Sequence, residues 1–184
     1  MPGDPQQSVR SRPQSAVVRI AERALKTPVG VVQVGASEEA VLYVELPRRR
    51  GPAPRFERWL HDHLLSRGDT PVLREALAQL RQYFAGKRQR FDVPVDATGT
   101  EFQRRVWALV AAIPYGQTVA YASIARQLGS SGKARAVGAA VGANPSPIII
   151  PCHRVIGADG SLTGYGGGLR MKVWLLRHER ALLA

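Results

Sequence analysis

The sequence predicts an α+β fold in which a small mixed domain precedes a mainly helical domain. Two runs typical of strands occur at residues 30–35 and 41–46, and helix signals dominate from residue 100 onward. With 184 residues, the chain is long enough for two small domains. We therefore expect three segments: a disordered tail at residues 1–16, an N-terminal domain at residues 17–96 and a C-terminal domain at residues 97–184.

In the N-terminal half, residues 36–40 join the two predicted strands into a hairpin. Residues 55–66 are expected to form a short helix. A second helix is marked more clearly, because Pro71 suits a first helical turn and Gly86 suits a helix end. Residues 91–95 are expected to form a strand at the joint between the two halves.

In the C-terminal half, Thr100 and Gln103 form a capping box that predicts the start of a helix, and Pro114 predicts its end. Two further short helices are expected at residues 121–128 and 133–143, around a glycine-bearing turn. This pair is a candidate helix-turn-helix motif, but any antiparallel pair of helices has the same pattern.

The chain carries a formal net charge of +12, which makes a polyanion its leading partner. From residue 97 onward there are ten lysines and arginines but only three acids, Glu101, Asp159 and Glu179. The first half is more mixed, with eleven acids and sixteen bases. Charge alone leaves open the alternative of a basic protein that binds no nucleic acid.

The predicted helix at residues 133–143 has an unusually bare outward face. Its inward face holds Ala134, Val137 and Val141. The outward face consists of one arginine and three small residues: Arg135, Gly138, Ala139 and Gly142. Each glycine costs the helix about 1 kcal/mol relative to alanine, which close approach of another molecule would explain. A helix is about 10–12 Å across and a minor groove about 6 Å wide, so a bare face favours a widened minor groove; the alternative is close packing against a neighbouring helix.

Cys152 is the only cysteine of the chain and follows an apolar, strand-like run at residues 148–150. One thiol cannot close a disulfide within the chain, so its role is either reaction or quiet burial. An unperturbed thiol has a pKa of about 8.5, so a nucleophilic role near neutral pH requires a base. His153 is the nearest base in sequence, but on an extended backbone it would point away from Cys152. Contact therefore requires a turn after Pro151 or a bridging water.

A base of this kind is usually oriented by a third group, most often a carboxylate. Glu179, on a last helix expected at residues 171–183, is one of the three acids in this half. The structural alternative is that His153 is a satisfied core histidine and that Glu179 pairs with Arg177 or Arg180 on the helix surface.

Two more segments are candidates for the walls of a site around Cys152. Asn144 either caps the helix before it or reaches the Cys152 loop. Residues 163–168 form a glycine-rich loop around Tyr165. This loop lacks the lysine and the serine or threonine of a phosphate-binding loop, so we expect no nucleotide cofactor. A flexible wall whose aromatic ring stacks on a flat ligand fits better.

The composition also argues against several classes of protein. No apolar run is long enough to cross a bilayer, and the first sixteen residues contain no continuous hydrophobic segment of a secretory signal. We therefore expect a cytoplasmic protein with no membrane partner. Because there is no second cysteine, we expect no structural zinc and no other metal.

The second half resembles the 6-O-alkylguanine-DNA alkyltransferases, also called methylated-DNA-protein-cysteine methyltransferases. Residues 151–155 (PCHRV) match the signature of that family. Four further motifs lie in matching order and spacing: residues 113–116 (IPYG), 135–138 (RAVG), 144–145 (NP) and 165–168 (YGGG). The resemblance extends from about residue 99 to residue 179. It implies a ribonuclease-H-like α/β domain, matched more weakly, followed by a winged helix-turn-helix-like domain for DNA binding and catalysis.

The resemblance implies a role for each residue around the thiol. Cys152 would accept an alkyl group from the guanine oxygen, and His153 would take the thiol proton through a water. Glu179 would orient the imidazole, while Asn144 would hold the active-site loop. Tyr121 would aid extrusion of the nucleotide and protonate the departing base.

The resemblance also implies contacts with the substrate. Arg135 would enter the base stack where the guanine has left. The other DNA-binding residues would be Ala134, Gly138, Ala139 and Gly142. The base pocket would be lined by Tyr165, Gly166, Gly167, Lys172 and Val155.

The function implied by the resemblance is direct-reversal DNA repair by a single-turnover transfer to Cys152, with 4-O-alkylthymine left open as a second substrate. The partner would be double-stranded DNA carrying alkylated guanine, bound through the minor groove. We expect a monomer that is nucleoid-associated in a bacterium, and leave open cooperative binding along DNA. Two other interpretations are a DNA-binding sensor of damage and a cysteine hydrolase or acyltransferase, which needs an oxyanion site that the sequence does not clearly supply.

Overall fold

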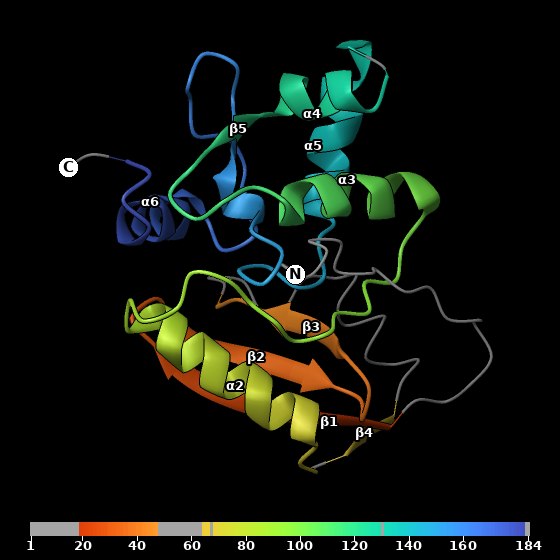
Figure 1. The fold of residues 1–184 in the computed structure, drawn as a ribbon, viewed down its shortest axis with the longest axis vertical. Helices are drawn as coiled ribbons and strands as arrows, with labels where there is room; N and C mark the ends of the chain where they lie inside the picture. Colours follow the sequence, from red (N-terminus) through yellow and green to blue (C-terminus); the bar gives the residue numbers. More distant parts are fainter. Residues whose placement is uncertain (1–18, 48–63, 67, 130, 183–184) are drawn as a thin grey trace, which may run out of the picture.

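The structure is a computed structural model that describes residues 19–47, 64–66, 68–129 and 131–182. The expected tail at residues 1–16 and most of the helix expected at residues 55–66 lie outside this part of the chain. The described part has the predicted α+β architecture, with a sheet and a helix in the N-terminal half and mainly helices in the C-terminal half (Figure 1).

A four-stranded sheet in the order β3-β2-β1-β4 forms the base of the N-terminal half. Its strands are β1 (Arg19–Thr27), β2 (Gly30–Ala36), β3 (Val41–Glu45) and β4 (Leu64–Ser66). Strand β2 pairs antiparallel with β1 and with β3, which confirms the predicted hairpin. Strand β4 pairs parallel with β1, so the prediction that residues 64–66 end a helix is wrong: the backbone of these residues extends the sheet instead.

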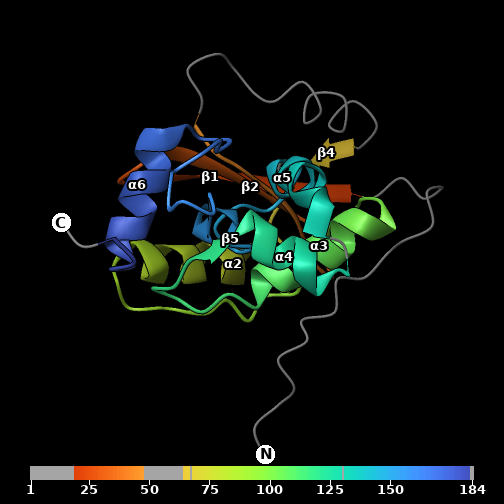
Figure 2. The ribbon, with the colours of Figure 1, turned by 90° about the horizontal axis from the view of Figure 1, so that it is seen from above.

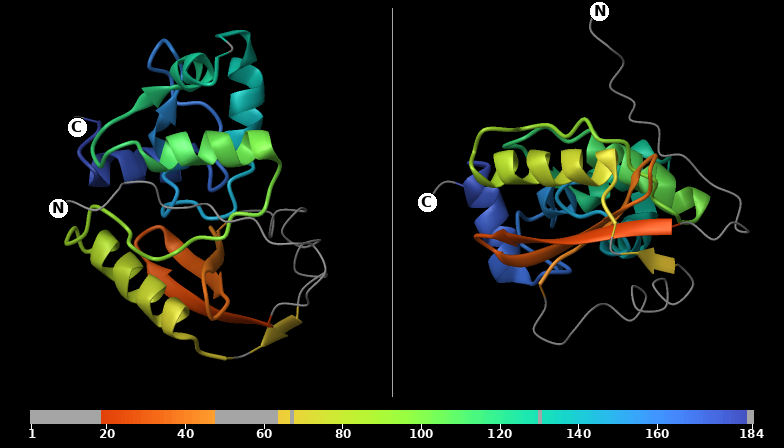
Figure 3. Two further views of the ribbon diagram at one scale, coloured as in Figure 1. Left: turned by 45° about the vertical axis from the view of Figure 1, so that its right-hand side comes forward. Right: turned by 90° about the horizontal axis from the view of Figure 1, so that it is seen from below.

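Helix α2 (Pro71–Phe84) covers one face of this sheet, as the view from below in Figure 3 shows. The hydroxyl of Thr70 accepts a hydrogen bond from the backbone N–H of Leu73, and Pro71 occupies the first turn, as predicted. The inward side chains recur at helical spacing: Leu73, Ala76, Leu77, Leu80 and Tyr83. Packing of this stripe therefore directs Tyr83, in the last turn, toward the interior.

The C-terminal half begins with helix α3 (Glu101–Ala111), where the predicted capping box between Thr100 and Gln103 is present. Three elements follow: β5 (Val119–Ala120), α4 (Tyr121–Gln127) and the short 3-10 turn η1 (Ser131–Lys133). Helix α5 (Ala134–Gly142) completes the predicted helix-turn-helix pair with α4, at the end of the molecule away from the sheet (Figure 1). The last elements are η2 (Cys152–Arg154), β6 (Val155–Ile156) and α6 (Leu169–His178).

One apolar core continues through both halves. The indole of Trp107 on α3 donates a hydrogen bond of 2.8 Å to the carbonyl of Ala140 on α5. Between the halves, the amide of Val44 on β3 donates to the carbonyl of Pro145, at 2.9 Å. This hydrogen bond joins strand β3 directly to the turn that follows α5. Seen from the α4 and α5 end in Figure 2, α6 lies at the edge of the molecule opposite α3.

Two segments expected as strands have other conformations. Residues 91–95 contribute only one bridge, between Val95 and Val41, because Pro94 has no amide hydrogen for a longer ladder. Residues 148–150 form a buried tight turn, in which Ile148 has a φ of 76°. The amide of Ile150 closes this turn on the carbonyl of Ser146, at 2.9 Å. The run before Cys152 is therefore a turn and not a strand.

The last helix ends earlier than predicted. Helix α6 stops at His178, and Glu179 is its C-terminal cap. Arg180 adopts a φ of 58°, a left-handed conformation that ends helices. Glu179 therefore lies just beyond the helix, in a segment that turns back toward the interior.

Candidate active site around Cys152

The thiol of Cys152 lies at the start of the short turn η2, and the side chain is 7% exposed. The amide of Cys152 donates to the carbonyl of Ile150 at 2.8 Å, and the amide of Arg154 donates to that of Pro151 at 2.9 Å. A turn after Pro151 was one of the two conditions for contact between Cys152 and His153. The structure contains this turn.

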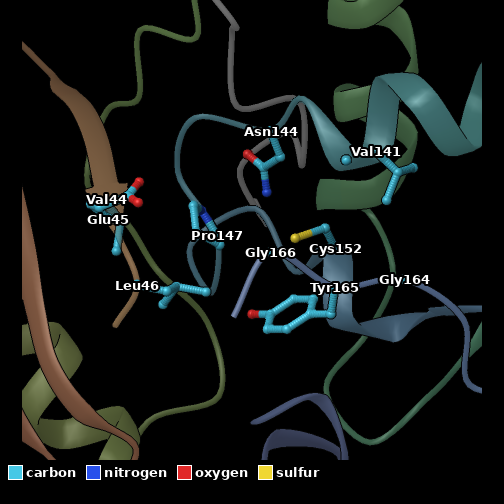
Figure 4. Close-up of a pocket in the computed structure, with 11 residues that line it drawn as sticks. Val44, Glu45, Leu46, Val141, Asn144, Pro147, Cys152, Gly164, Tyr165 and Gly166 are labelled. Carbon is cyan, nitrogen blue, oxygen red and sulfur yellow. The ribbon is translucent and has the colours of Figure 1, made fainter. Parts of the chain in front are cut away.

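Cys152 lines a pocket whose walls come from both halves of the chain. Figure 4 shows its sulfur directed into the pocket, between Asn144 and the ring of Tyr165. Sequence analysis placed Tyr165 and Gly166 there, but it missed the opposite wall on β3. Because β3 is more than 100 residues away in sequence, no local pattern could indicate this wall. It is formed by Val44, Glu45 and the following Leu46.

His153 and Glu179 form a fully buried pair. The Nε2 atom of the imidazole lies 2.8 Å from the Oε1 atom of the carboxylate. Because the carboxylate accepts a hydrogen bond there, the neutral imidazole carries its proton on Nε2 and a lone pair on Nδ1. Within the described part of the chain, Nδ1 has no hydrogen-bond partner. The pair thus presents a buried, unprotonated ring nitrogen next to the Cys152 turn.

Arg154 is a second partner of Glu179 that sequence analysis did not assign. Its Nε atom donates to Oε2 at 2.8 Å and its Nη2 atom to Oε1 at 2.9 Å, a two-point pairing. Its Nη1 atom donates to the carbonyl of Ile113. Glu179 therefore pairs with His153 and Arg154 in the interior, not with Arg177 or Arg180 on the surface. The signal in the sequence was a cation directly after the imidazole.

The charges of this cluster follow from burial and hydrogen bonding. Burial raises the pKa of Glu179, but hydrogen bonds and charge from His153 and Arg154 outweigh it and bring the pKa from 4.5 down to about 2. Burial lowers the pKa of His153, and Glu179 only partly offsets this effect. At neutral pH the carboxylate is therefore ionised and the imidazole is neutral, as a general base requires.

Asn144 ties the end of α5 to the turn before Cys152. Its Nδ2 atom donates to the carbonyl of Ile150 at 2.8 Å, and its Oδ1 atom accepts from the amide of Ser146 at 2.9 Å. The side chain is buried. Of the two alternatives for Asn144, the geometry corresponds to contact with the Cys152 loop and not to a helix cap.

The buried Lys172 connects two backbone segments near the site by hydrogen bonds. Its Nζ atom donates to the carbonyls of Val155, at 2.6 Å, and of Thr163, at 2.9 Å. Burial lowers its pKa, although the proximity of Cys152 acts in the opposite direction. The Nζ atom also lies 5.9 Å from the ring centre of Tyr121. Lys172 therefore joins β6, the glycine-rich loop and the start of α4.

The hydroxyl groups of Tyr121 and Tyr165, the two tyrosines at the site, remain protonated at neutral pH. Burial raises the pKa of Tyr121, opposed by a hydrogen bond with Thr163. Burial also raises the pKa of Tyr165, whose ring meets that of His153 edge to face with centres 6.4 Å apart. A side-chain carbon added at Gly167 would collide with Met171, so this part of the loop packs closely on α6.

The outward face of α5 is bare in the structure as well as in the sequence. Arg135, Ala139 and Gly142 are exposed, whereas Val137 and Val141 are buried. Among the described residues, nothing lies within 4 Å of a side-chain carbon added at Gly142. At Gly138, the nearest such contact is the Tyr121 ring at 3.9 Å. Close packing against a neighbouring helix therefore does not explain these glycines.

The described residues contain no group of three or more His, Cys, Asp or Glu side chains placed to hold a metal ion. None of their helices combines the length and apolar composition of a membrane span.

Both halves of the chain match models of one protein family. Residues 20–97 match the ribonuclease-like domain of 6-O-methylguanine DNA methyltransferase, and residues 101–181 match its DNA-binding domain. A methylated-DNA-protein-cysteine methyltransferase of Salmonella typhimurium is 45% identical over 91% of this chain and 99% of its own length. The chain belongs to the methylated-DNA-protein-cysteine methyltransferase family. The family predicted from the five sequence motifs is thereby confirmed.

Two mycobacterial proteins extend the comparison. A methylated-DNA-protein-cysteine methyltransferase of Mycolicibacterium paratuberculosis is 58% identical over 57% of this chain, and the match spans 64% of the length of that relative. The solved O6-methylguanine methyltransferase of Mycobacterium tuberculosis is 40% identical, covering 88% of this chain and 93% of its own, with a TM-score of 0.75. A further structure of the Mycobacterium tuberculosis protein is a complex with DNA. The two-part architecture is thus that of methylated-DNA-protein-cysteine methyltransferases.

Proposed function

We propose that this protein repairs DNA by direct reversal, transferring an alkyl group from the oxygen of an alkylated guanine to Cys152. The observation that carries the proposal is the buried His153 and Glu179 pair, 2.8 Å apart, beside the only thiol of the chain. Family membership supports the same reaction. Alkylated thymine, modified at its 4-oxygen, is a second substrate of the same chemistry.

The reaction needs one base, one nucleophile and one acid. The lone pair on Nδ1 of His153 takes the thiol proton through a bridging water, and Glu179 stabilises the imidazolium that forms. The thiolate of Cys152 then attacks the alkyl carbon, so that a C–S bond forms while the C–O bond to guanine breaks. Tyr121, whose hydroxyl stays protonated because burial raises its pKa, donates a proton to the departing base. The proton held by His153 then returns to the Tyr121 phenolate through solvent, so that one alkyl group has moved to sulfur and one proton to guanine.

The product explains why turnover stops. A thioether has no acyl or phosphoryl centre for water to attack, so the alkyl group stays on the sulfur. Each protein molecule therefore repairs one lesion. No cofactor takes part in this scheme.

The target atom is inaccessible inside a duplex, so the base must leave the stack at a cost of a few kcal/mol. We assign this step to the bare face of α5, which enters the minor groove. The protein binds DNA as a monomer. Arg135 takes the place of the extruded base, and Gly138, Ala139 and Gly142 contact the groove. Ala134, which is half-buried at the first position of α5, contacts the groove from the end of the helix. The net charge of +12 favours binding to the phosphate backbone.

The extruded base enters the pocket beside the thiol. Tyr165 stacks on it and Gly166 leaves room for it. Gly167 supports this wall by packing closely on Met171, and Val155 and Lys172, joined by a hydrogen bond of 2.6 Å, support the glycine-rich loop from the protein interior. Asn144 holds the loop that carries Cys152. We propose residues 17–96 and 97–184 as the two domains, and the cytoplasm, at the nucleoid of a bacterium, as the location of the protein.

Arg135→Ala should separate base extrusion from chemistry. We expect repair of methylguanine in a duplex to fall about 10- to 100-fold, because the variant has nothing to fill the gap in the base stack. Reaction with a free alkylated guanine base should be unchanged, because no extrusion is required. Arg74→Ala, which removes an exposed arginine on α2, is the charge-matched control. Equal losses on both substrates would contradict the role of Arg135.

The proposed function is tested by following the methyl group. The wild-type protein is incubated with a duplex that carries one radiolabelled methylguanine, and the protein is then digested and analysed by mass spectrometry. The peptide containing Cys152 should gain one methyl group per repaired lesion, and the label should leave the DNA. An unchanged peptide beside a persisting lesion would refute the proposal.

A further inference from the structure

Tyr83, on helix α2 of the N-terminal half, reaches the catalytic carboxylate. Its hydroxyl donates a hydrogen bond of 2.7 Å to Oε1 of Glu179, and both side chains are buried. The backbone of the same tyrosine makes a second link, because the Nε2 atom of His178 lies 2.7 Å from the Tyr83 carbonyl. One residue of the N-terminal half thus holds two consecutive residues at the end of α6.

The Oε1 atom of Glu179 is shared by three donors: the Tyr83 hydroxyl, Nε2 of His153 and Nη2 of Arg154. The Oε2 atom faces Nε of Arg154 and, at 3.4 Å, the amide of Gly116. The other titratable or charged groups around this cluster include Lys172, whose charge lowers the pKa of His153, and Cys152 beside Tyr165 and Lys172; the remaining ones are Tyr115, His178, Tyr165 and Arg180.

The shared oxygen has two tasks that oppose each other. Glu179 must orient His153, but a carboxylate that attracts the imidazole proton too strongly would protonate the ring and remove the base. Each additional donor to Oε1 draws electron density from the carboxylate and weakens its attraction for the proton on His153. Arg154 supplies one such donor, and Tyr83 supplies the other.

We propose that Tyr83 is a positioning residue for the alkyl transfer: its hydroxyl holds Oε1 of Glu179 in line with His153 and keeps the imidazole neutral. This inference rests on the proposed function of the site. It also gives the N-terminal half a part in the chemistry. The pKa of Tyr83 is raised by burial and by Glu179, so the hydroxyl remains a donor.

Tyr83→Phe removes the hydroxyl but keeps the ring, which packs against Phe84, Phe91 and His178 with centres 5.1 to 5.5 Å apart. We expect methyl transfer from a duplex to be about three- to tenfold slower near pH 6 and to approach the wild-type rate near pH 9. The reason is that His153 binds its proton more tightly once Oε1 has lost a donor. Titration of His153 by NMR should show a pKa higher than in the wild-type protein.

The matched control is Tyr43→Phe, which removes another buried tyrosine hydroxyl that binds a carboxylate, that of Glu22. It should leave the pH profile unchanged. A Tyr83→Phe profile that coincides with the wild type, or a loss that is equal at every pH, would overturn the proposal, since the latter indicates a merely structural role. The two hypotheses fail separately: wild-type protein that takes up no methyl group refutes the proposed function, whereas the NMR titration still tests Tyr83.

Discussion

Cys152→Ala will abolish alkyl transfer while leaving binding to damaged DNA intact. No other thiol exists in the chain, and Cys152 directly precedes the His153 base in sequence. Cys152→Ser should be equally inactive, because a hydroxyl is far less ionised than a thiol at neutral pH and its oxygen is a poorer nucleophile. The measurement is single-turnover transfer of labelled methyl from duplex DNA, with binding followed in parallel by fluorescence anisotropy.

The alanine variant also separates repair from the sensing of damage. A sensor would need Cys152 only for recognition, so its wild-type form would bind the lesion without removing it. A repair protein removes the methyl group in wild-type form and, as Cys152→Ala, forms a lasting complex with the lesion. Residual transfer by Cys152→Ala would show that a different residue accepts the alkyl group.

Glu179→Gln should impair both activity and stability. The glutamine removes the negative charge that faces His153 and Arg154, two groups that are buried with it. Breaking a buried ion pair by removing one partner costs about 3–5 kcal/mol of folding free energy. Replacing the carboxylate that orients the histidine of a Ser-His-Asp triad lowers kcat about 10⁴-fold, and we expect a loss of at least about 100-fold here. Urea unfolding and single-turnover transfer measure the two effects.

The stability loss of Glu179→Gln should depend on pH with a definite sign. The folded pKa of Glu179, about 2, lies below its ordinary value of 4.5. Its stabilisation is therefore complete above pH 4.5 and is lost as the pH falls from 4.5 toward 2. The difference in unfolding free energy between wild type and variant should shrink over this range. Glu38→Gln, at an exposed position between β2 and β3, is the control and should change stability little at any pH. A deficit that stays constant down to the acid end would contradict the assigned charge.

Local signals in the sequence predicted much of the fold. The capping box at Thr100 and the proline in the first turn of α2 both mark helix starts. Such starts depend on hydrogen bonds between residues close in sequence, so the sequence alone indicates them. Strand β1 was missed because its sequence, RIAERALKT, is rich in residues that favour helices. Pairing with β2 on one side and β4 on the other decides its conformation. The pairing with β2 is a tight hairpin, with Thr27 opposite Gly30, whereas the pairing with β4 is long-range and leaves no local pattern in the sequence.

The same division applies to the site. Cys152 and His153 are adjacent in sequence, and the motif around them identified the family. Tyr83 and the β3 wall reach the site only through packing of the two halves, so a single sequence without an alignment does not reveal them. The turn at residues 148–150 was read as a strand because three isoleucines favour extended structure, whereas burial and flanking prolines impose a turn.

On the bare face of α5, the residues that would best stabilise the fold differ from those that the proposed function requires. At Gly142 the described structure leaves open space for a larger residue, and alanine would favour the helix by about 1 kcal/mol. A screen for heat resistance alone would therefore drift toward bulkier residues on this face. Under the proposed function, in which this face enters the minor groove, such proteins would melt at a higher temperature but bind DNA more weakly.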